Sequence, residues 1–322
     1  MLTVGVANAE GCPNDPGDLC PNVIAMSWLV RNARTAFAQP RMFPSYLRWL
    51  LLKNLGMAGR EARMVTGVRW GGFAGFGDYL SQRSAPSPAI QAFVRHVMRD
   101  GVVVFDVGAN LGSFSLYVAS CGLGSAGLFA FEPIPKTFEG LRANLQRCGV
   151  PARCERLALG EAVHSEADFV VPRGGPAIAA VRTVKDDPDE AIATARMTTI
   201  DQLVSENNVP FVDLLKLDVE GYEISVLLGA ETTIREGRLR AICLEVCPGN
   251  LKRFGRSAEE LYQAVSDLGF RVWLWDERKD TLRECPSQDA FCGLVLADVL
   301  CTHKGTWVQR PGMNGYMLPE RL

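Results

Sequence analysis

The sequence predicts an α/β fold in which a mostly parallel sheet carries helices on both faces. Three observations predict it. Residues 102–105 are a run of Val and Phe, which is typical of a strand buried on both faces. A glycine-bearing turn and a helical pattern to residue 119 follow, and this strand–turn–helix unit is typical of nucleotide-binding α/β folds. Buried strands and helices then alternate along most of the remaining chain, apart from residues 160–198.

Composition places the chain among ordinary globular proteins. It has 322 residues, of which 48% are hydrophobic and 22% charged, enough for one large domain with an N-terminal addition. The net charge of -2 argues against a nucleic-acid partner held by a strong positive field. The ten cysteines form no C-x-x-C pair and no zinc spacing, so we expect reduced thiols in a cytoplasmic protein.

The chain is expected to divide into four parts. Residues 1–22 read as a flexible leader without a secretory signal, and residues 23–85 as a helical and loop extension that covers the site. Residues 86–303 form the main domain, with an insertion at 160–198, and residues 304–322 form a tail. No apolar run reaches the ~18 residues of a transmembrane segment.

Two segments of the extension leave alternatives open. Basic residues around 41–63 would allow a weak contact with a membrane surface, although a helix packed on the main domain is the simpler interpretation. The Gly- and aromatic-rich loop at 65–85 would either fold over a ligand or form a hairpin.

The turn after the first strand indicates which cofactor it holds. It reads D-x-G-x-N-x-G from Asp106, whereas a pyrophosphate-binding turn reads G-x-G-x-x-G. Gly108 and Gly112 permit a close backbone approach, and the helix that begins at Ser113 and Phe114 offers unpaired N–H groups. Asp106 would repel a pyrophosphate but suits a cation. The residues therefore favour S-adenosylmethionine, which carries an ammonium and a sulfonium group but no phosphate, over NAD.

Acids end the next predicted strands as well. Glu132 closes the strand at 127–132, where a carboxylate accepts both ribose hydroxyls of a nucleoside. The alternative is an exposed acid at the start of a loop. A short third strand at 153–157 is followed by small residues from Ala158 onward, which would let an adenine ring lie flat.

The fourth predicted strand, 211–221, ends in charged residues. Lys216, Asp218 and Glu220 alternate with period 2 and would point to one side. Such charges are costly unless they are paired or functional. We interpret Lys216 as partly structural, paired with Asp218 or Glu220, and Asp218 as lying beside the cofactor and its acceptor. Glu245 is a further acid near the end of the fifth strand.

The remaining segments complete the predicted sheet. The insertion at 160–198 has loop compositions at 173–176 and 185–190, and residues 167–171 would form a small hairpin strand. The last strands, 270–275 and 290–300, are expected to pair antiparallel at one edge of the sheet, with His303 after them.

Four motifs together resemble the FkbM-type S-adenosylmethionine-dependent methyltransferases over roughly residues 75–300. The most specific is K-x-D-x-E-G-x-E, which begins at Lys216, and the others are D-V-G-A-N-L-G at 106–112, F-E-P at 131–133 and T-I-D at 199–201. The resemblance implies the class I, Rossmann-like fold with a seven-stranded sheet and an antiparallel last strand. It also implies O-methylation of a hydroxyl group, commonly on a sugar or a secondary metabolite.

The predicted site has a cofactor part and a catalytic part. S-adenosylmethionine, which leaves as S-adenosylhomocysteine, would be held by Asp106, Gly108, Ala109, Asn110, Gly112, Ser113, Phe114, Glu132, Pro133, Ala158 and Asp218. The general base is expected among Asp218, Glu220 and Glu245, with His303 an outsider. No metal is expected, although a divalent ion on Asp218 and Glu245 is a conceivable variant. The partner is a small-molecule or glycan hydroxyl acceptor, and a homodimer is left open.

Three other functions are alternatives. A nucleotide-dependent oxidoreductase would use the same architecture, but the missing G-x-x-G step argues against it. A nucleic-acid methyltransferase often carries N-P-P-Y after the fourth strand, where this chain has D-V-E-G at 218–221. A non-catalytic S-adenosylmethionine-binding module would keep the fold without turnover.

Overall fold

A computed structural model describes ten stretches of the chain: 62–63, 69–70, 86–97, 101–122, 127–171, 180–183, 191–276, 281–303, 308–309 and 316–317. The chain divides into two units, Met1–Ala58 and Gly59–Leu322, and the described residues all belong to the second. The predicted leader at 1–22, the basic segment at 41–63 apart from residues 62–63, the loop at 65–85 apart from residues 69–70 and most of the 304–322 tail lie outside the described residues.

Two short pairs of strands flank the main domain in sequence. β1 (Ala62–Arg63) pairs antiparallel with β2 (Arg69–Trp70), and β15 (Val308–Gln309) pairs antiparallel with β16 (Tyr316–Met317). None of the described helices has the length and apolar character needed to cross a membrane.

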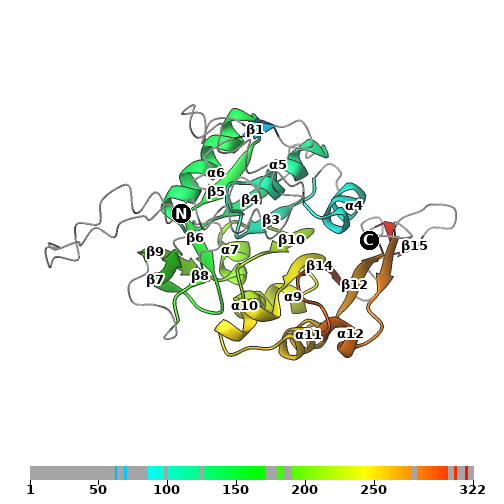
Figure 1. Cartoon of the computed structure of the whole chain (residues 1–322). Coiled ribbons are helices and arrows are strands. Elements are labelled where there is room, and N and C mark those ends of the chain that lie inside the picture. The colour runs from blue at the N-terminus through cyan, green and yellow to red at the C-terminus, as the bar shows by residue number, and fades with distance from the viewer. Residues whose placement is uncertain are drawn as a thin grey trace, which may run out of the picture. The chain divides into compact units, whose positions relative to one another are not determined.

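An eight-stranded sheet forms the centre of the main domain, in the order β13-β12-β14-β11-β10-β3-β4-β5 (Figure 1). Its strands are β3 (Val104–Val107), β4 (Leu128–Phe131), β5 (Ala152–Glu155), β10 (Leu214–Leu217), β11 (Ala241–Val246), β12 (Phe270–Asp276), β13 (Thr281–Glu284) and β14 (Ala297–His303). The five strands from β5 to β11 run parallel, and β14 runs antiparallel to both β11 and β12. The mostly parallel sheet with an antiparallel last strand is confirmed. It has one strand more than the seven expected, because β13 adds to the edge at β12.

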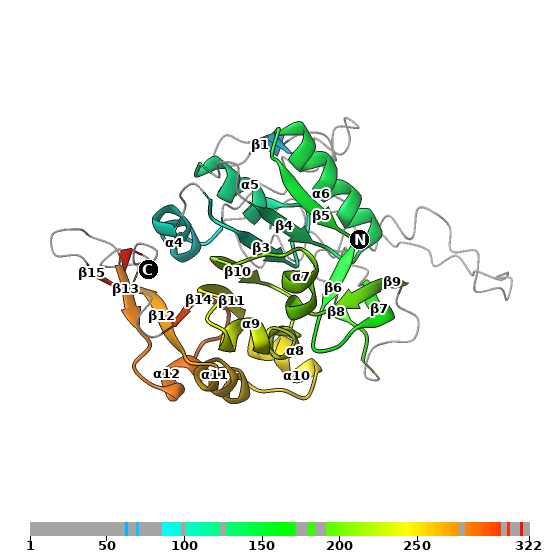
Figure 2. The same cartoon turned by 180° about the vertical axis from the view of Figure 1, so that it is seen from behind.

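Helices cover both faces of this sheet (Figures 1 and 2). They are α4 (Pro88–Val97), α5 (Ser113–Ser120), α6 (Pro135–Arg147), α7 (Ile200–Glu206), α8 (Glu223–Leu228), α9 (Glu231–Arg235), α10 (Pro248–Arg253), α11 (Ala258–Asp267) and α12 (Gln288–Cys292). On one face, Phe93 of α4 and Val118 of α5 pack in a core that includes Leu214. On the other, α8 and α11 pack in a core that includes Leu215 and Leu244. Neighbouring residues of a strand therefore enter different cores.

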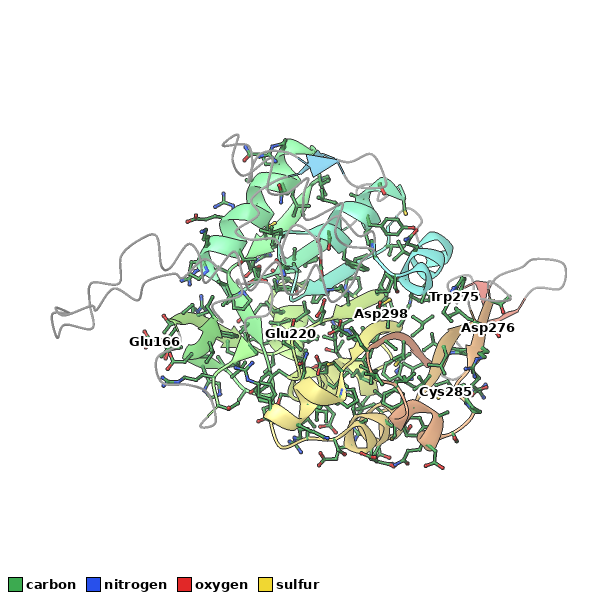
Figure 3. All side chains as sticks on the ribbon, viewed as in Figure 1. Glu166, Glu220, Trp275, Asp276, Cys285 and Asp298 are labelled. Carbon is green, nitrogen blue, oxygen red and sulfur yellow. The ribbon has the colours of Figure 1, made fainter. Side chains whose placement is uncertain are left out.

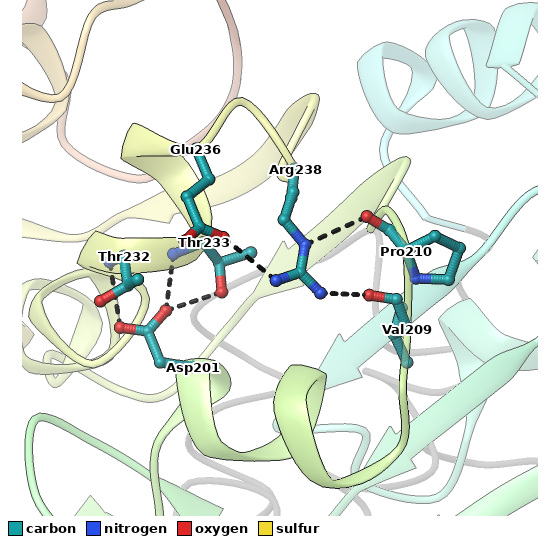
Figure 4. Close-up of polar contacts among 7 residues, drawn as sticks. All are labelled: Asp201, Val209, Pro210, Thr232, Thr233, Glu236 and Arg238. Carbon is teal, nitrogen blue, oxygen red and sulfur yellow. Dashed lines mark hydrogen bonds and ion pairs between the residues drawn. The ribbon is translucent and has the colours of Figure 1, made fainter.

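The T-I-D motif at 199–201 has a structural role in the helices beyond the sheet (Figure 4). Thr199 is the N-cap of α7, and its side chain accepts a hydrogen bond from the Gln202 backbone N–H. The Asp201 carboxylate accepts hydrogen bonds from the backbone N–H groups of Thr232 and Thr233 at the start of α9, at 3.0 and 2.7 Å. The motif thus joins two helices that are distant in sequence.

Part of the insertion belongs to a second sheet, which includes a strand at 191–198 that the sequence did not predict. The loops expected at 173–176 and 185–190 lie outside the described residues. β6 (Leu157–Leu159), β7 (His164–Val171), β8 (Ala180–Val181) and β9 (Ala191–Thr198) form a four-stranded sheet in the order β6-β9-β7-β8. The hairpin strand expected at 167–171 is part of β7. Both views place β7 and β9 on the side of the main sheet away from β12 (Figures 1 and 2).

Three further boundaries differ from the sequence prediction. The third strand ends at Glu155, and Leu157 already belongs to β6. The fourth strand ends at Leu217 rather than at residue 221. The strand expected at 290–300 begins only at Ala297, because Ser287 accepts a hydrogen bond from the Ala290 backbone N–H and caps α12 there.

His303 lies at the wrong end of the sheet to act as a base. It is the last residue of β14 and pairs with Phe270, the first residue of β12, with ring centroids 4.1 Å apart. Because β12 runs with the parallel strands, this pair marks their amino ends. The acids described below lie at their carboxyl ends.

Candidate active site

The Gly-rich turn joins β3 to α5 at the carboxyl edge of the sheet. Gly108, Asn110 and Gly112 all have positive φ angles, of 74°, 52° and 93°. A Cβ added to Gly108 would lie 1.8 Å from the backbone oxygen of Asp218, so the end of β10 requires a glycine here. The backbone N–H groups of Gly108 and Ala109 donate to the Phe131 oxygen at 3.1 and 3.0 Å. The turn is therefore held between β4 and β10.

Glu132 fixes the outer part of this turn. Its two carboxylate oxygens accept hydrogen bonds from the backbone N–H groups of Asn110 and Ile134, both at 2.9 Å. The side chain is buried, and burial raises its pKa to about 7. Each oxygen keeps capacity for a second hydrogen bond, so the contact with ribose stays a prediction. Pro133 follows it and is half-buried.

A buried lysine lies between two of the predicted site acids. The Lys216 ammonium donates to Asp218 Oδ2 at 2.9 Å and lies 3.8 Å from Asp106 Oδ1. Burial alone would lower the pKa of Lys216, but the carboxylates of Asp218 and Asp106 outweigh it and raise that pKa. Lys216 is therefore a permanent cation, and its expected ion pair is with Asp218 rather than with Glu220.

Asp106 is fully buried beneath the turn. Its Oδ2 accepts a hydrogen bond from the Ser115 hydroxyl at 2.6 Å, while Oδ1 has no hydrogen-bond partner among the described residues. Burial raises the pKa of Asp106, against the effects of Lys216 and Ser115. The structure thus gives Asp106 a role in holding Lys216. Its contact with the cofactor stays a prediction.

Two other predicted cofactor residues lie within cores. Phe114 is 2% exposed in the core beneath α4 and α5, and its ring centroid is 5.9 Å from the Lys216 ammonium. Ala158 is 5% exposed in β6 and belongs to a core with Phe169 and Met197. Ser113 is half-buried at the first position of α5, where the preceding Gly112 supplies no side-chain cap.

The chain after β10 forms a strained turn instead of a longer strand. Glu220 has a φ of 54°, which is uncommon for a residue with a Cβ, and Gly221 has a φ of 103°. Glu220 Oε2 accepts a hydrogen bond from the Asn250 side chain at 2.7 Å. Burial, with the nearby charges of Asp218 and Glu223, raises the pKa of Glu220 to about 7.

A row of acids follows the carboxyl edge across three strands. The ladder pairs Leu217 with Leu244, so Asp218 comes next to Glu245, and Glu245 pairs directly with Asp298 of β14. Burial first, and then the charges of Asp218 and Glu220, raise the pKa of Glu245 to about 8. Burial also raises the pKa of Asp298, although a hydrogen bond from Ser87 opposes it.

Asp298 and Ser87 were not among the predicted site residues. Ser87 accepts a hydrogen bond from the Ile90 backbone N–H at the start of α4, so its hydroxyl is fixed where it meets Asp298. The available signal was the predicted antiparallel direction of the last strand. An antiparallel strand begins at the edge where its parallel neighbours end, so an acid near its start joins their carboxyl ends.

A cavity of about 460 Å³ opens beside Glu245 and Asp298. Ser87 completes its polar side, and Leu274, Trp275 and Leu296 contribute to its apolar side. Its volume is in the range of small-molecule sites. Of the predicted catalytic residues, Glu245 lines this cavity, whereas Asp218 and Glu220, which follow β10, are not among its lining residues. Within the described residues, no group of three or more His, Cys, Asp or Glu side chains is arranged to hold a metal ion.

Comparison with known protein families identifies one family. Residues 106–272 match the family model of the methyltransferase FkbM domain. The chain is 31% identical over 185 residues to the 31-O-demethyl-FK506 methyltransferase FkbM of Streptomyces tacrolimicus, covering 48% of this chain and 70% of that protein. It is 32% identical over 133 residues to the hexuronic acid methyltransferase AglP of Haloferax volcanii, covering 41% of this chain and 52% of AglP.

Other relatives match over a smaller part of their length. The AMB antimetabolite synthetase AmbE of Pseudomonas aeruginosa is 31% identical over 229 residues, which cover 58% of this chain but 10% of AmbE. Among solved structures, the methyltransferase FkbM of Methylobacillus flagellatus superposes with a TM-score of 0.40 and 16% identity, covering 64% of this chain and 44% of that one.

Proposed function

Because the chain belongs to the FkbM methyltransferase family, we propose that it transfers a methyl group from S-adenosylmethionine to a hydroxyl group of a small molecule or glycan. The observation that carries the proposal is the row of acids at the carboxyl edge, which runs from the Gly-rich turn to the cavity. The names of FkbM and AglP, which methylate an FK506 precursor and a hexuronic acid, support a hydroxyl-bearing acceptor.

The residues around the turn fit S-adenosylmethionine. Acids dominate there, and the ammonium of Lys216 is already paired with Asp218, which leaves no free cation among the described residues of the turn for a pyrophosphate. We propose that the backbone of 108–112 and Glu132 hold the nucleoside. When bound, S-adenosylmethionine supplies the electrophilic methyl group.

We propose Glu245 as the general base that takes the proton of the acceptor hydroxyl. It lines the cavity, and its pKa of about 8 lies close to neutral pH, where a base is most effective. Asp218 already accepts a hydrogen bond from Lys216, and Glu220 accepts one from Asn250. The hydroxyl proton would pass to a Glu245 carboxylate oxygen while the hydroxyl oxygen forms its bond to the methyl carbon. The bond between that carbon and the sulfonium sulfur would break, and S-adenosylhomocysteine would leave.

Calorimetry and turnover of the Glu245→Gln variant test this proposal. We expect the protein to bind S-adenosylhomocysteine and not NADH, and the variant to bind S-adenosylhomocysteine as the parent does. Methyl transfer by the variant should fall by about 10²–10⁴-fold, the usual contribution of a general base. Glu166→Gln is the control, because Glu166 is exposed on β7 and away from Asp298 (Figure 3). Tight binding of NADH without S-adenosylhomocysteine binding would overturn the proposal.

We extend the proposal to the surroundings in which the enzyme works. All described cysteines are free thiols, which supports a reducing, cytoplasmic compartment. The net charge of -2 supports an acceptor other than a nucleic acid. A weak membrane contact through residues 41–63 and a homodimer both stay proposals.

A further inference from the structure

We infer that the cavity between β11, β12, β13 and β14 is the acceptor subsite, and that it takes an uncharged acceptor with two adjacent hydroxyl groups on an apolar framework. This inference rests on the proposed methyl transfer and names the acceptor class for the same site. Its elements come from distant parts of the chain, since Ser87 precedes α4 while Glu245, Trp275 and Asp298 come from three strands.

The position of the cavity suits an acceptor. Asp298 lies directly across from Glu245 in the β11–β14 ladder, and Asp218 comes next to Glu245 on the other side. The row continues to the turn, because Val107 pairs with Leu217 and a Cβ on Gly108 would touch Asp218. A ligand in the cavity therefore lies on the same edge of the sheet as the turn proposed to hold the methyl donor.

The polar side of the cavity is a pair of carboxyl groups. Residues that face each other across two antiparallel strands have Cβ atoms about 4.5–5.5 Å apart, and two negative charges there repel. The pair avoids that repulsion when it keeps one proton, and burial raises the pKa of both groups. A pair with one proton offers both a donor and acceptors. Two adjacent hydroxyls match it, because each hydroxyl can donate and accept.

Ser87 divides the roles of the two acids. Its hydroxyl hydrogen-bonds Asp298 and is itself fixed by the start of α4, so Asp298 is suited to hold one hydroxyl in place. Glu245 has no such partner among the described hydrogen bonds, and it takes the proton from the other hydroxyl when the proton kept by the pair lies on Asp298. Asp298 is therefore a positioning residue for the hydroxyl that reacts with Glu245.

The remaining side of the cavity is apolar. Leu274, Trp275, Leu294, Leu296 and Ala297 line it. Leu296 is 66% exposed and the adjacent Val295 is 82% exposed, so apolar surface continues from the cavity to the solvent. Large apolar side chains exposed beside a pocket favour a ligand with a carbon surface. Arg283 also lines the cavity, on β13, and an acceptor bearing a carboxylate is the competing reading.

Binding of small probes tests the acceptor class. The protein is saturated with S-adenosylhomocysteine, and cis-1,2-cyclohexanediol, cyclohexanol, phenyl β-glucoside, glucose and glucuronic acid are titrated by calorimetry. We expect the diol to bind at least about 10-fold more tightly than cyclohexanol, because cyclohexanol lacks one hydrogen bond to a charged group. Phenyl β-glucoside should also bind more tightly than glucose, because its ring adds apolar contact.

Paired variants test the roles of the polar side and the apolar side of the cavity. Asp298→Ala should lose the preference for the diol over cyclohexanol, and Asp298→Asn should keep it, because the amide still donates and accepts. Trp275→Ala should lose the preference for phenyl β-glucoside over glucose. Glu166→Gln should change neither preference, since Glu166 is exposed on β7. Unchanged affinity for S-adenosylhomocysteine shows that each variant is folded.

Three results would overturn the inference. The first is that no diol binds, or that neither Asp298→Ala nor Trp275→Ala changes the preferences while S-adenosylhomocysteine still binds. The second is that glucuronic acid binds best and loses that advantage in Arg283→Gln, which would assign the cavity to anionic acceptors. The third is failure of the parent protein to bind S-adenosylhomocysteine, which overturns the proposed function together with the inference built on it.

Discussion

Glu245 shows how the surroundings of one carboxyl group set its chemistry. An ordinary glutamate is ionised at neutral pH, whereas burial and the charges of Asp218 and Glu220 raise the pKa of Glu245 to about 8. A base with such a pKa binds a proton more strongly than ordinary carboxylates do. Lys216 limits this rise in the pKa of Glu245, because its ammonium pairs with Asp218 and offsets the charge of that carboxylate.

The rate of methyl transfer should follow the ionisation of Glu245. The protonated form cannot accept the hydroxyl proton, so kcat/KM should rise with pH and level off above about 8. Glu245→Gln should remove this rise along with most of the activity. The measurement is kcat/KM from about pH 6 to pH 9.5, a range that brackets the raised pKa. A profile that is flat across this range would exclude Glu245 as the base.

Gly108→Ala tests the packing of the turn against β10. The added Cβ would lie 1.8 Å from the Asp218 backbone oxygen, and the φ of 74° disfavours alanine. We expect a loss of unfolding free energy of several kcal/mol, since overpacking costs about 1–3 kcal/mol and a left-handed residue about 1–2 kcal/mol more. Urea unfolding measures it.

Gly149→Ala is the matched control for that prediction. Gly149 also has a positive φ, of 66°, but nothing lies within 4 Å of an added Cβ. Gly149→Ala should therefore lose only about 1–2 kcal/mol of unfolding free energy, which is the cost of placing alanine in a left-handed backbone conformation. If the two variants lose the same unfolding free energy, the turn can shift to make room for the added Cβ, and the close approach of Gly108 to Asp218 is not rigid.

Among the elements, α7 and α9 depend on one carboxylate. Asp201 accepts three hydrogen bonds at the start of α9, two from backbone N–H groups and one from the Thr233 hydroxyl at 2.6 Å. Nearby, Arg238 donates to the backbone oxygens of Val209 and Pro210, which join α7 to β10 (Figure 4). The hydrogen bonds of the T-I-D motif thus give it a role in helix packing.

Asp201→Ala should destabilise the fold while leaving the cofactor site intact. Loss of a helix cap costs about 0.5–2 kcal/mol, and Thr233 is buried, so we expect the upper end of this range. Glu236→Ala is the control, because its ion pair with Arg238 is largely exposed and should cost less than about 1 kcal/mol. Urea unfolding and S-adenosylhomocysteine affinity are measured together. A loss of affinity without a loss of stability would contradict the structural role.

The elements also show where sequence patterns are informative. The strands β3 and β4 and the helix α6 could be predicted, because their apolar runs and the proline at the start of α6 act locally. β9 could not, because its sequence A-I-A-T-A-R-M-T has little β-propensity, and its pairing with β6 and β7 supplies what the residues lack. The end of β10 was misplaced because Lys216, Asp218 and Glu220 keep a strand-like period through a turn.

At the scale of the whole molecule, the cluster of buried acids should make stability depend on pH. Glu132, Glu220 and Glu223 have pKa values raised to about 7, and Glu245 to about 8, against an ordinary 4.5. Between these values the folded protein holds more protons than the unfolded chain. Stability is therefore greatest at low pH within this window and falls as the pH rises through about 8.

Thermal unfolding from about pH 5 to pH 8.5 measures this dependence of stability on pH, because the acids with raised pKa values ionise within that range. The melting temperature should fall as the pH rises. In Glu245→Gln, the part of the fall nearest to pH 8 should be reduced, because the group with the highest pKa has been removed. A melting temperature that rises through this range would show that the acids are ionised in the folded protein.

The candidate site could be predicted in part at the same scale. Gly108, Glu132, Asp218 and Glu245 do meet at one edge of the sheet, because parallel strands share their carboxyl ends. Asp298 could not be placed without the register of β14, and Ser87 could not be placed without the packing of α4. Such contacts depend on tertiary structure and cannot be predicted from local sequence patterns.

Because β14 runs in the reversed direction, the residues proposed to hold the methyl donor and those proposed to hold the acceptor come from different parts of the chain and can change independently. The turn and Glu132 come from the first half of the main domain, whereas Trp275, Leu296 and Asp298 come from its last third. Substitutions near the start of β14 would therefore alter which acceptors enter, without touching the cradle proposed for the methyl donor. Duplicated copies of such a gene would be free to diversify in acceptor while inheriting one unchanged donor half.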